Sequence, residues 1–336
     1  MIVVIGATGF LGSHLLCHLV QNDEKIRAIY RNKESITLTE GFLQFYTNVS
    51  PQLFKEKIEW IQADVLDIES LILAFQGATY IYNCSGYVSF DKCDKEQMIA
   101  VNVTGTANIV NACLHCNCTK LVHVSSIAAL GETNTSDSIT EEIQWIRNAS
   151  ESWYSITKFY AETEVWRGIA EGLSAVIVNP SVIIGPGDWS KGSPTFFTIV
   201  YDGLKYYTNG IVGFVDVRDL CRAMIQVMNS TINGERFVVS GSNESYQELF
   251  TKIALAINKP IAKHKATALM LSIAWKIEWL RSFILGTSPL ITKNSARTAG
   301  KKSFYSSQKL IIALRFDFTP FDKTIEFTGN CFLNSK

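Results

Sequence analysis

The stretch Met1-Ile-Val-Val-Ile-Gly-Ala-Thr-Gly-Phe-Leu-Gly12 decides the fold of this 336-residue chain. The apolar run Ile2–Ile5 is typical of a buried strand, and an apolar pattern of helical length follows the last glycine. Gly6 permits a sharp turn, Gly9 lets the backbone approach a pyrophosphate, and Gly12 lets the helix pack close to the strand. The stretch therefore predicts a strand, a glycine turn and a helix whose N-terminus points at phosphates.

Strand-like and helix-like segments alternate along the rest of the first half. Helical patterns cover Glu96–Cys116 and Trp153–Ala170. The alternation predicts an α/β fold with a doubly wound parallel sheet of the Rossmann type, and ligands at the carboxyl ends of its strands. The expected strands are Ile2–Ile5, Ile26–Tyr30, Ile58–Gln62, Tyr80–Asn83, Leu121–Ser125, Ala175–Asn179 and Glu235–Val239.

Two aromatic-rich segments depart from this alternation. We expect residues 185–216 and 241–336 to form a smaller, discontinuous substrate-binding lobe, and residues 1–184 with 217–240 to form the dinucleotide-binding domain. A helix is expected over Ala268–Leu285. Its charged residues are too few and too mixed for a membrane-surface helix, so we expect it to pack against the lobe.

The composition excludes several classes of protein. Lys+Arg and Asp+Glu are both 31, so the net charge does not indicate nucleic acid as a partner. No secretory signal and no membrane-spanning stretch is expected, which together with eight cysteines predicts a cytoplasmic protein with reduced thiols. Cys113, Cys116 and Cys118 are clustered, but no second ligand pair has zinc-binding spacing, so no metal site is expected.

Tyr154 and Lys158 lie one helical turn apart at the start of an expected helix. Two other Tyr/Lys pairs share this spacing, but only this helix follows a strand that ends in Ser125-Ser126. Reduction of a carbonyl leaves an alkoxide that needs a proton, and a nearby ammonium with a positive nicotinamide ring would lower the tyrosine pKa toward the working range. Ser126 would donate a hydrogen bond to the substrate oxygen.

With these residues the chain resembles the extended short-chain dehydrogenase/reductase family, which contains NAD(P)-dependent epimerases, dehydratases and dihydroflavonol-reductase-like enzymes. The resemblance is densest before about residue 220. It depends on Gly6-Ala-Thr-Gly-Phe-Leu-Gly12, Ala63-Asp64-Val65, Val101-Asn102-Val103-Thr104-Gly105, Val124-Ser125-Ser126, Tyr154…Lys158, the run from Asn179 to Asp188 and Val215-Asp216-Val217-Arg218-Asp219-Leu220.

The resemblance assigns further roles. Catalysis falls to Ser126, Tyr154 and Lys158, with Ser126 preferred over Ser125 because the hydroxyl precedes a glycine, Gly131, by five positions. Lys158 would also hold the nicotinamide ribose. The other implied cofactor contacts are Gly6, Thr8, Gly9, Phe10, Leu11 and Gly12 in the turn, Asp64 and Val65 at the adenine, Cys84, Ser85 and Gly86 at the adenosine ribose, and Pro180 and Val182 along the nicotinamide. The family also implies a homodimer paired through Glu96–Cys116 and Trp153–Ala170.

The end of the second strand predicts the cofactor. Proteins that prefer NAD place an acid there, whereas this chain has Arg31 and Lys33, and a guanidinium suits the 2′-phosphate of NADP. NAD remains the alternative.

The segment 185–216 is aromatic and has no arginine, which favours an apolar or aromatic carbonyl compound over a nucleotide sugar. Arg218, Arg281 or Arg297 could supply a diphosphate clamp from elsewhere. We therefore expect an NADP-dependent reductase of a ketone or aldehyde. A nucleotide-sugar epimerase or dehydratase and a non-catalytic dinucleotide sensor stay as alternatives.

Overall fold

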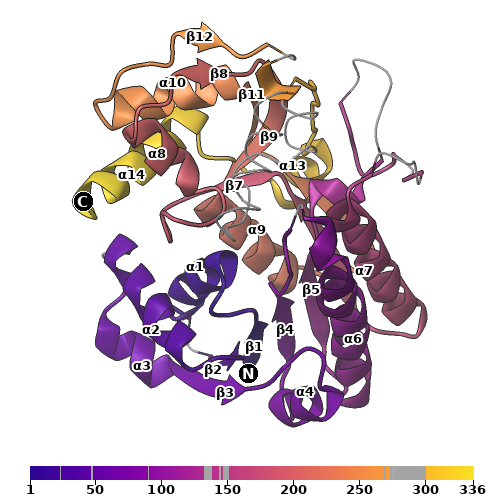
Figure 1. Cartoon of the computed structure of the whole chain (residues 1–336). Coiled ribbons are helices and arrows are strands. Elements are labelled where there is room, and N and C mark those ends of the chain that lie inside the picture. The colour runs from indigo at the N-terminus through magenta and orange to yellow at the C-terminus, as the bar shows by residue number, and fades with distance from the viewer. Residues whose placement is uncertain are drawn as a thin grey trace.

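A seven-stranded sheet forms the centre of the computed structural model (Figure 1). The structure describes residues 1–22, 24–46, 48–89, 91–131, 138–143, 145–146, 151–267, 270–272, 275 and 300–336. Every neighbouring pair of strands in this sheet is parallel. The strand order is β10-β6-β5-β4-β1-β2-β3. The bounds are β1 Ile2–Ile5, β2 Ile26–Tyr30, β3 Ile58–Gln62, β4 Tyr80–Asn83, β5 Lys120–Val124, β6 Ala175–Pro180 and β10 Glu235–Val239. This sheet confirms the doubly wound fold. Its bounds differ from the expected ones only in β5, which begins and ends one residue earlier, and in β6, which ends one residue later.

Helices cover both faces of this sheet (Figure 1). On one face α1 (Phe10–Leu19) packs against α9 (Val217–Asn229), and Leu16 and Met224 are fully buried there. On the other face lie α4 (Ile68–Phe75), α6 (Gly105–His115) and α7 (Trp153–Ala170). Each buried aliphatic side chain contributes about 1.5–3 kcal/mol, so the two apolar layers hold the helices to the sheet. The link from β2 to β3 consists of α2 (Glu34–Glu40), a 3₁₀ turn (Gly41–Phe45) and α3 (Pro51–Lys57).

The helix expected over Glu96–Cys116 is divided into three parts. α5 (Lys95–Met98) continues into a π-helical segment, Ile99–Thr104, and then into α6. Asn102 lies in the π-helical segment and its side-chain amide exchanges two hydrogen bonds with the backbone of Tyr87. A π-helical turn often marks a functional position, and this one lies beside the start of α7.

A smaller sheet with its own helices forms a lobe above the central sheet (Figure 1). Its strands, β7 (Val182–Ile184), β9 (Ile211–Asp216) and β11 (Ser242–Ser245), run in the order β11-β9-β7. The helices α8 (Thr195–Tyr201), α10 (Tyr246–Ala256) and α14 (Phe321–Asn334) pack around a core in which Phe197, Phe214 and Phe332 are buried. The aromatic residues of segment 185–216 therefore serve in part as the core of the lobe.

The proposed division of the chain stays a prediction, and two elements lie across it. β7 comes before residue 185 but pairs with β9 of the lobe. α13 (Gln308–Leu314) comes after residue 241, yet its Leu310 packs in the core beneath the central sheet. Most of the helix expected over Ala268–Leu285 lies outside the described residues. In the part of the chain that the structure describes, no helix has the length and apolar character needed to cross a bilayer.

Candidate active site

Four loops meet at one edge of the central sheet. β1, β4, β5 and β6 are neighbours and parallel, so the residues that follow them lie at the same edge. These are the glycine turn after β1, Cys84–Gly86 after β4, Ser125 and Ser126 after β5, and the Pro180–Val182 link after β6. The structure thus gathers most of the site residues expected from the sequence.

The glycine turn is shaped by close backbone contacts. Gly6 has a φ of +70°, and a Cβ there would lie 2.7 Å from the backbone of Cys84 and Ser85. A Cβ on Gly12 would lie 2.1 Å from the Gly6 carbonyl oxygen, so α1 starts directly against the turn. Both positions require glycine for the fold itself.

Gly9 differs from the other two glycines. A Cβ there would meet only the Gly6 carbonyl oxygen, at 3.2 Å, and Gly9 is exposed. Gly9 is also the N-cap of α1, and it supplies no side chain to the free N–H groups of the first turn. An open backbone face beside uncapped N–H groups fits the diphosphate of a dinucleotide.

The next two residues of the turn use their side chains for packing. Leu11 is 7 % exposed and belongs to the core under the sheet. The Phe10 ring lies against the loop after β7, where a Cβ on Gly187 would come within 2.9 Å of it. Phe10 and Leu11 could therefore contact a cofactor only through their backbone, and Phe10 joins the glycine turn to the lobe.

The ends of β2 and β3 carry the residues expected at the adenosine half of the cofactor. Arg31 is exposed, and no hydrogen bond or ion pair ties its guanidinium to any described part of the chain. Asp64 accepts a hydrogen bond from the Leu66 backbone at 3.0 Å, which fixes the loop after β3. Val65 is held against α6, since its carbonyl accepts a hydrogen bond from Asn108 at 2.9 Å.

The loop after β4 passes over Lys158. A Cβ on Gly86 would lie 3.4 Å from the Lys158 ammonium nitrogen and 3.7 Å from Oδ1 of Asn102. Ser85 donates two hydrogen bonds to the Asn83 side chain, at 3.0 Å from its backbone and 2.6 Å from its hydroxyl. Burial raises the pKa of the Cys84 thiol to about 12, so this thiol is not a nucleophile at neutral pH.

Tyr154 and Ser126 lie within hydrogen-bonding distance of each other. Burial raises the pKa of Tyr154 above its usual value, and its hydrogen bond with Ser126 opposes that rise. Desolvation of the phenolate outweighs the effect of this hydrogen bond, and the lowering expected from a nicotinamide ring beside Tyr154 stays a prediction. The Ser126 hydroxyl also accepts a hydrogen bond from the Ala128 backbone at 3.1 Å and so begins a short 3₁₀ turn.

Lys158 is 5 % exposed and donates a hydrogen bond to the Val124 carbonyl at 2.9 Å. Burial lowers the pKa of its ammonium group to about 8, while the negative charge of Glu162 acts in the opposite direction. The lysine is therefore held close to its titration range at the pH of a cell.

A buried polar network behind these residues is missing from the sequence-based prediction. Glu162 is 1 % exposed and accepts hydrogen bonds from Asn179 at 2.5 Å and Arg236 at 3.2 Å. Asn179 also donates to the Ser126 carbonyl at 2.9 Å, so the network holds the backbone of Ser126. In the sequence Glu162 stands four residues after Lys158. An ordinary ion pair on a solvated helix face has the same spacing, so the spacing alone does not indicate a buried network.

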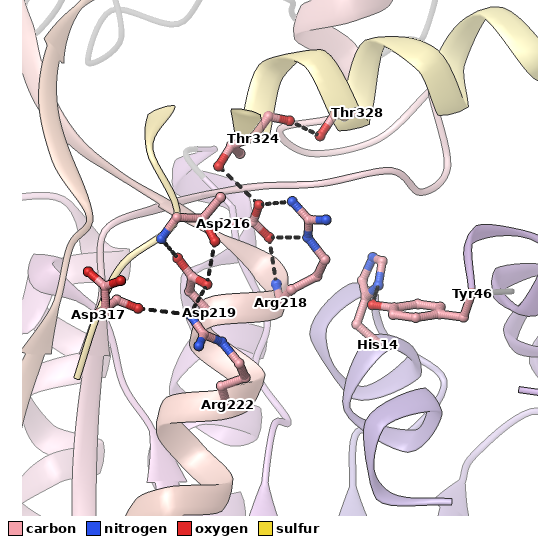
Figure 2. Close-up of polar contacts among 10 residues, drawn as sticks. His14, Tyr46, Asp216, Arg218, Asp219, Arg222, Asp317, Thr324 and Thr328 are labelled. Carbon is pink, nitrogen blue, oxygen red and sulfur yellow. Dashed lines mark hydrogen bonds and ion pairs between the residues drawn. The ribbon is translucent and has the colours of Figure 1, made fainter. Parts of the chain in front are cut away.

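On the other side of the site, α1 is joined to the lobe by a neutral histidine. His14 contacts the Pro186 carbonyl through Nε2 at 2.8 Å. Its Nδ1 lies 2.6 Å from the Tyr46 hydroxyl (Figure 2). A carbonyl can only accept, so Nε2 carries the proton and the Tyr46 hydroxyl donates to Nδ1. Burial lowers the pKa of His14 to about 3, which keeps the imidazole neutral.

Arg218 is paired with the buried carboxylate of Asp216. Asp216 accepts hydrogen bonds from Nε of Arg218 at 3.0 Å and from Nη2 at 2.5 Å (Figure 2). The same carboxylate accepts a hydrogen bond from Thr324 of α14 at 3.0 Å, and the guanidinium lies 3.8 Å from the Phe327 ring centroid. Arg218 is therefore committed to holding α14. Arg281 and Arg297, the other two arginines considered for a diphosphate clamp, lie outside the described residues.

The cysteine cluster shows ordinary packing. The Cys118 backbone bonds to the Cys113 carbonyl at 3.0 Å and closes the end of α6, and burial raises the pKa of the Cys113 thiol. Among the residues that the structure describes, no group of three or more histidine, cysteine or acidic side chains could hold a metal ion.

Comparisons with known proteins agree with this architecture. Among curated proteins, the putative dihydroflavonol 4-reductase of Synechocystis is 25 % identical over 92 % of this chain and 87 % of its own length. Sterol demethylase protein B of Methylococcus capsulatus is 28 % identical over 72 % of this chain and 70 % of its own length. Cinnamoyl-CoA reductase 1 of Petunia hybrida is 27 % identical over 72 % of this chain and 73 % of its own length.

Solved structures share the fold. The structure of gox2253 matches with a TM-score of 0.79 and 23 % identity, covering 100 % of this chain and 98 % of that one. The dTDP-glucose 4,6-dehydratase DesIV from Streptomyces venezuelae, solved with NAD and TYD, matches with a TM-score of 0.76 and 17 % identity, covering 99 % and 97 %. Residues 2–240 match the NAD dependent epimerase/dehydratase family. The chain belongs to this family and is an NAD(P)-dependent enzyme of the extended short-chain dehydrogenase/reductase type.

Proposed function

We propose that this protein is an NADP-dependent reductase that transfers a hydride to the carbonyl carbon of a ketone or aldehyde. The observation that carries the proposal is the hydrogen bond between Ser126 and Tyr154, with the Lys158 ammonium one helical turn further along α7. Two hydroxyl groups side by side can both point at a single carbonyl oxygen. An ammonium behind them stabilises the negative charge that forms there.

Each residue of the chain has a separate task in this reaction. The bound cofactor supplies the hydride. Ser126 donates a hydrogen bond to the carbonyl oxygen and polarises it, and Tyr154 gives its proton to the same oxygen as negative charge develops. Lys158 lies under the loop after β4, where it can bind the nicotinamide ribose and stabilise the tyrosinate that remains.

Arg31 supports NADP as the cofactor. It is exposed at the end of β2, and the described chain offers its guanidinium no ionic partner. A guanidinium in this position can form charge-assisted hydrogen bonds with a 2′-phosphate, and no acid stands at the end of β2 to bind a free 2′-hydroxyl.

The substrate is proposed to be an apolar or aromatic carbonyl compound. The commitment of Arg218 to Asp216 and Phe327 removes it as a clamp for the diphosphate of a nucleotide sugar. The names of the relatives in Synechocystis and Petunia describe reductases of a dihydroflavonol and of a cinnamoyl thioester. A nucleotide-sugar epimerase or dehydratase is the second candidate, favoured by the NAD-bound DesIV structure of the same fold.

Titration of both cofactors against wild type and Arg31→Ala tests the proposal. We expect wild type to bind NADPH more tightly than NADH, and Arg31→Ala to weaken NADPH about 10- to 100-fold, since a charge-assisted hydrogen bond to phosphate contributes about 1.5–3 kcal/mol. Binding of NADH should hardly change, and added salt should reduce the preference because the contact is exposed.

Lys55→Ala removes an exposed cation from α3 and serves as the control for net charge. Equal losses for both cofactors in Arg31→Ala would mean that the residue supports the fold. Tightly held NAD in the purified protein, with no net NADPH consumption across a panel of carbonyl compounds, would favour the epimerase. Dinucleotide binding with no turnover of any carbonyl or nucleotide sugar would favour the sensor.

A further inference from the structure

Positive charge is concentrated in one part of this neutral chain. Residues 252–309 contain eleven of the 31 lysines and arginines but only one of the 31 acidic residues, Glu278. The segment therefore has an excess of ten positive charges, and the rest of the chain has the same excess of negative charges. Such an asymmetry indicates an interaction with an anionic partner.

The described part of this segment places basic side chains at the end of the lobe that is remote from the central sheet. There β12 (His264–Lys265) pairs in parallel with β8 (Tyr206–Tyr207), at the top of Figure 1. Lys205 joins the two strands, because its carbonyl accepts a hydrogen bond from the His264 backbone at 3.1 Å. Lys205, Lys263 and Lys265 are all exposed.

Apolar side chains are exposed among these lysines. Tyr206 is 47 % exposed and Ile261 is 41 % exposed. The Tyr206 ring lies 5.5 Å from the His264 ring, so the aromatic group is held in place on the ribbon. We call Lys205, Tyr206, Ile261, Lys263 and Lys265 the basic ribbon.

The chemistry of the basic ribbon matches an anionic lipid surface. Its lysines complement phosphate and carboxylate headgroups. No acidic residue occurs between Lys252 and Glu278 in the sequence, and one exposed acid, Asp202, lies three residues before Lys205. Tyrosine and isoleucine gain free energy when they enter the boundary between headgroups and acyl chains, which a nucleic acid backbone does not offer.

We propose that the basic ribbon docks this protein on the surface of a bilayer that contains anionic lipids. The proposal does not depend on the helix expected over Ala268–Leu285, whose own charges disfavour a membrane-surface role. Lys205, Lys263 and Lys265 bind the headgroups, and Tyr206 and Ile261 enter the boundary layer. The candidate active site lies at the other side of the lobe, toward the carboxyl ends of β1 and β5, so docking leaves it free (Figure 1).

Co-sedimentation of the full chain with lipid vesicles tests this. We expect binding to phosphatidylcholine vesicles that contain about 30 % phosphatidylserine, little binding to pure phosphatidylcholine, and release at about 0.5 M salt. A variant with Lys205→Gln, Lys263→Gln and Lys265→Gln should lose affinity about 100-fold, since each lysine contributes about fivefold. Tyr206→Ser with Ile261→Ser should weaken binding to the same vesicles at low salt, because two side chains that enter the boundary layer are removed.

The matched control carries Lys25→Gln, Lys55→Gln and Arg315→Gln, three exposed positions outside the basic ribbon and the candidate active site. Thermal unfolding and NADPH binding establish that each variant is folded. Equal losses in the control and ribbon variants would overturn the proposal, since net charge alone would then explain binding. Absence of binding to anionic vesicles at low salt would also overturn it, as would an equal affinity of the ribbon for RNA oligonucleotides.

Discussion

The candidate site has one side built by β5 and α7 and another built by β1 and α1. Each side buries a titratable group, but the pKa values of the two groups differ. Lys158 is 5 % exposed, and the opposing effects of burial and Glu162 leave its pKa at about 8. His14 is 0 % exposed, and its pKa is lowered to about 3 with no carboxylate within hydrogen-bonding contact. The first group can change charge at working pH, while the second stays neutral.

This difference follows the tasks proposed for the two sides. The α7 side moves a proton, so its groups need pKa values within reach of the surrounding pH. The α1 side presents backbone N–H groups to a diphosphate, and a histidine that changed charge there would make cofactor binding depend on pH. The hydrogen bonds from Tyr46 and to Pro186 satisfy a neutral imidazole completely.

The largest effect is expected when the proton donor itself is removed. Tyr154→Phe should lower kcat by about 100-fold or more, the usual scale for loss of a general acid, and leave the Kd of NADPH nearly unchanged. Steady-state kinetics and a cofactor titration measure the two quantities. Tyr160→Phe alters an exposed tyrosine of the same helix and should have no effect. Unchanged turnover in Tyr154→Phe would remove the catalytic assignment.

A smaller effect is expected on the α1 side, in stability at low pH. Burial lowers the pKa of His14 to about 3 and that of His18 to about 4, from 6.5. As the pH falls, these histidines therefore take up protons in the unfolded chain before they do so in the folded one. The free energy of unfolding decreases as the pH falls below 6.5. At pH 5 the loss approaches about 2 kcal/mol per histidine, measurable as a lower Tm.

His14→Gln cannot titrate in this range, so it should make the dependence of Tm on pH less steep, whatever its effect on Tm at neutral pH. His115→Gln, at the exposed end of α6, is the matched control and should keep the wild-type slope. An unchanged slope in His14→Gln would show that His14 does not contribute to acid sensitivity.

The smallest expected effect concerns the partner of Lys158. The kcat/KM of wild type should fall above about pH 8 as the Lys158 ammonium is lost. Glu162→Gln removes the charge that opposes the effect of burial, so the decline should move to lower pH by up to about one unit. Glu164→Gln, whose carboxylate pairs with Arg167 at the surface, is the control. A uniform loss of activity with an unmoved profile would limit Glu162 to a structural role.

Local periodicity is sufficient to predict much of the fold. The bounds of β1, β2, β3, β4, β10 and α7 agree with the expected ones, because buried parallel strands and long helices have strong patterns of their own. The grouping of Ser126, Tyr154 and Lys158 also follows from the strand and helix order. The break in the helix over Glu96–Cys116 could not be predicted, since it accompanies contacts of Asn102 with Tyr87 and Thr157, which are distant in sequence.

Electrostatic details depend on burial, which one sequence does not reveal. Glu162 has the spacing of a surface residue yet contacts Arg236, 74 positions away. The raised pKa of Tyr154 has the same origin, because desolvation depends on the loops that cover the phenol. Arg218 could serve as a phosphate clamp by sequence alone, and only the fold shows Asp216 and Phe327 holding it.

The contact between Phe10 and Gly187 has a consequence for protein engineering. The ring belongs to the glycine turn and the glycine to the loop that enters the lobe, and any Cβ at position 187 would lie 2.9 Å from the ring. A chimera that combines this nucleotide-binding half with the lobe of a relative must therefore keep glycine at 187 or exchange both positions together. Recombination between relatives is constrained at this pair, although neither residue takes part in the chemistry.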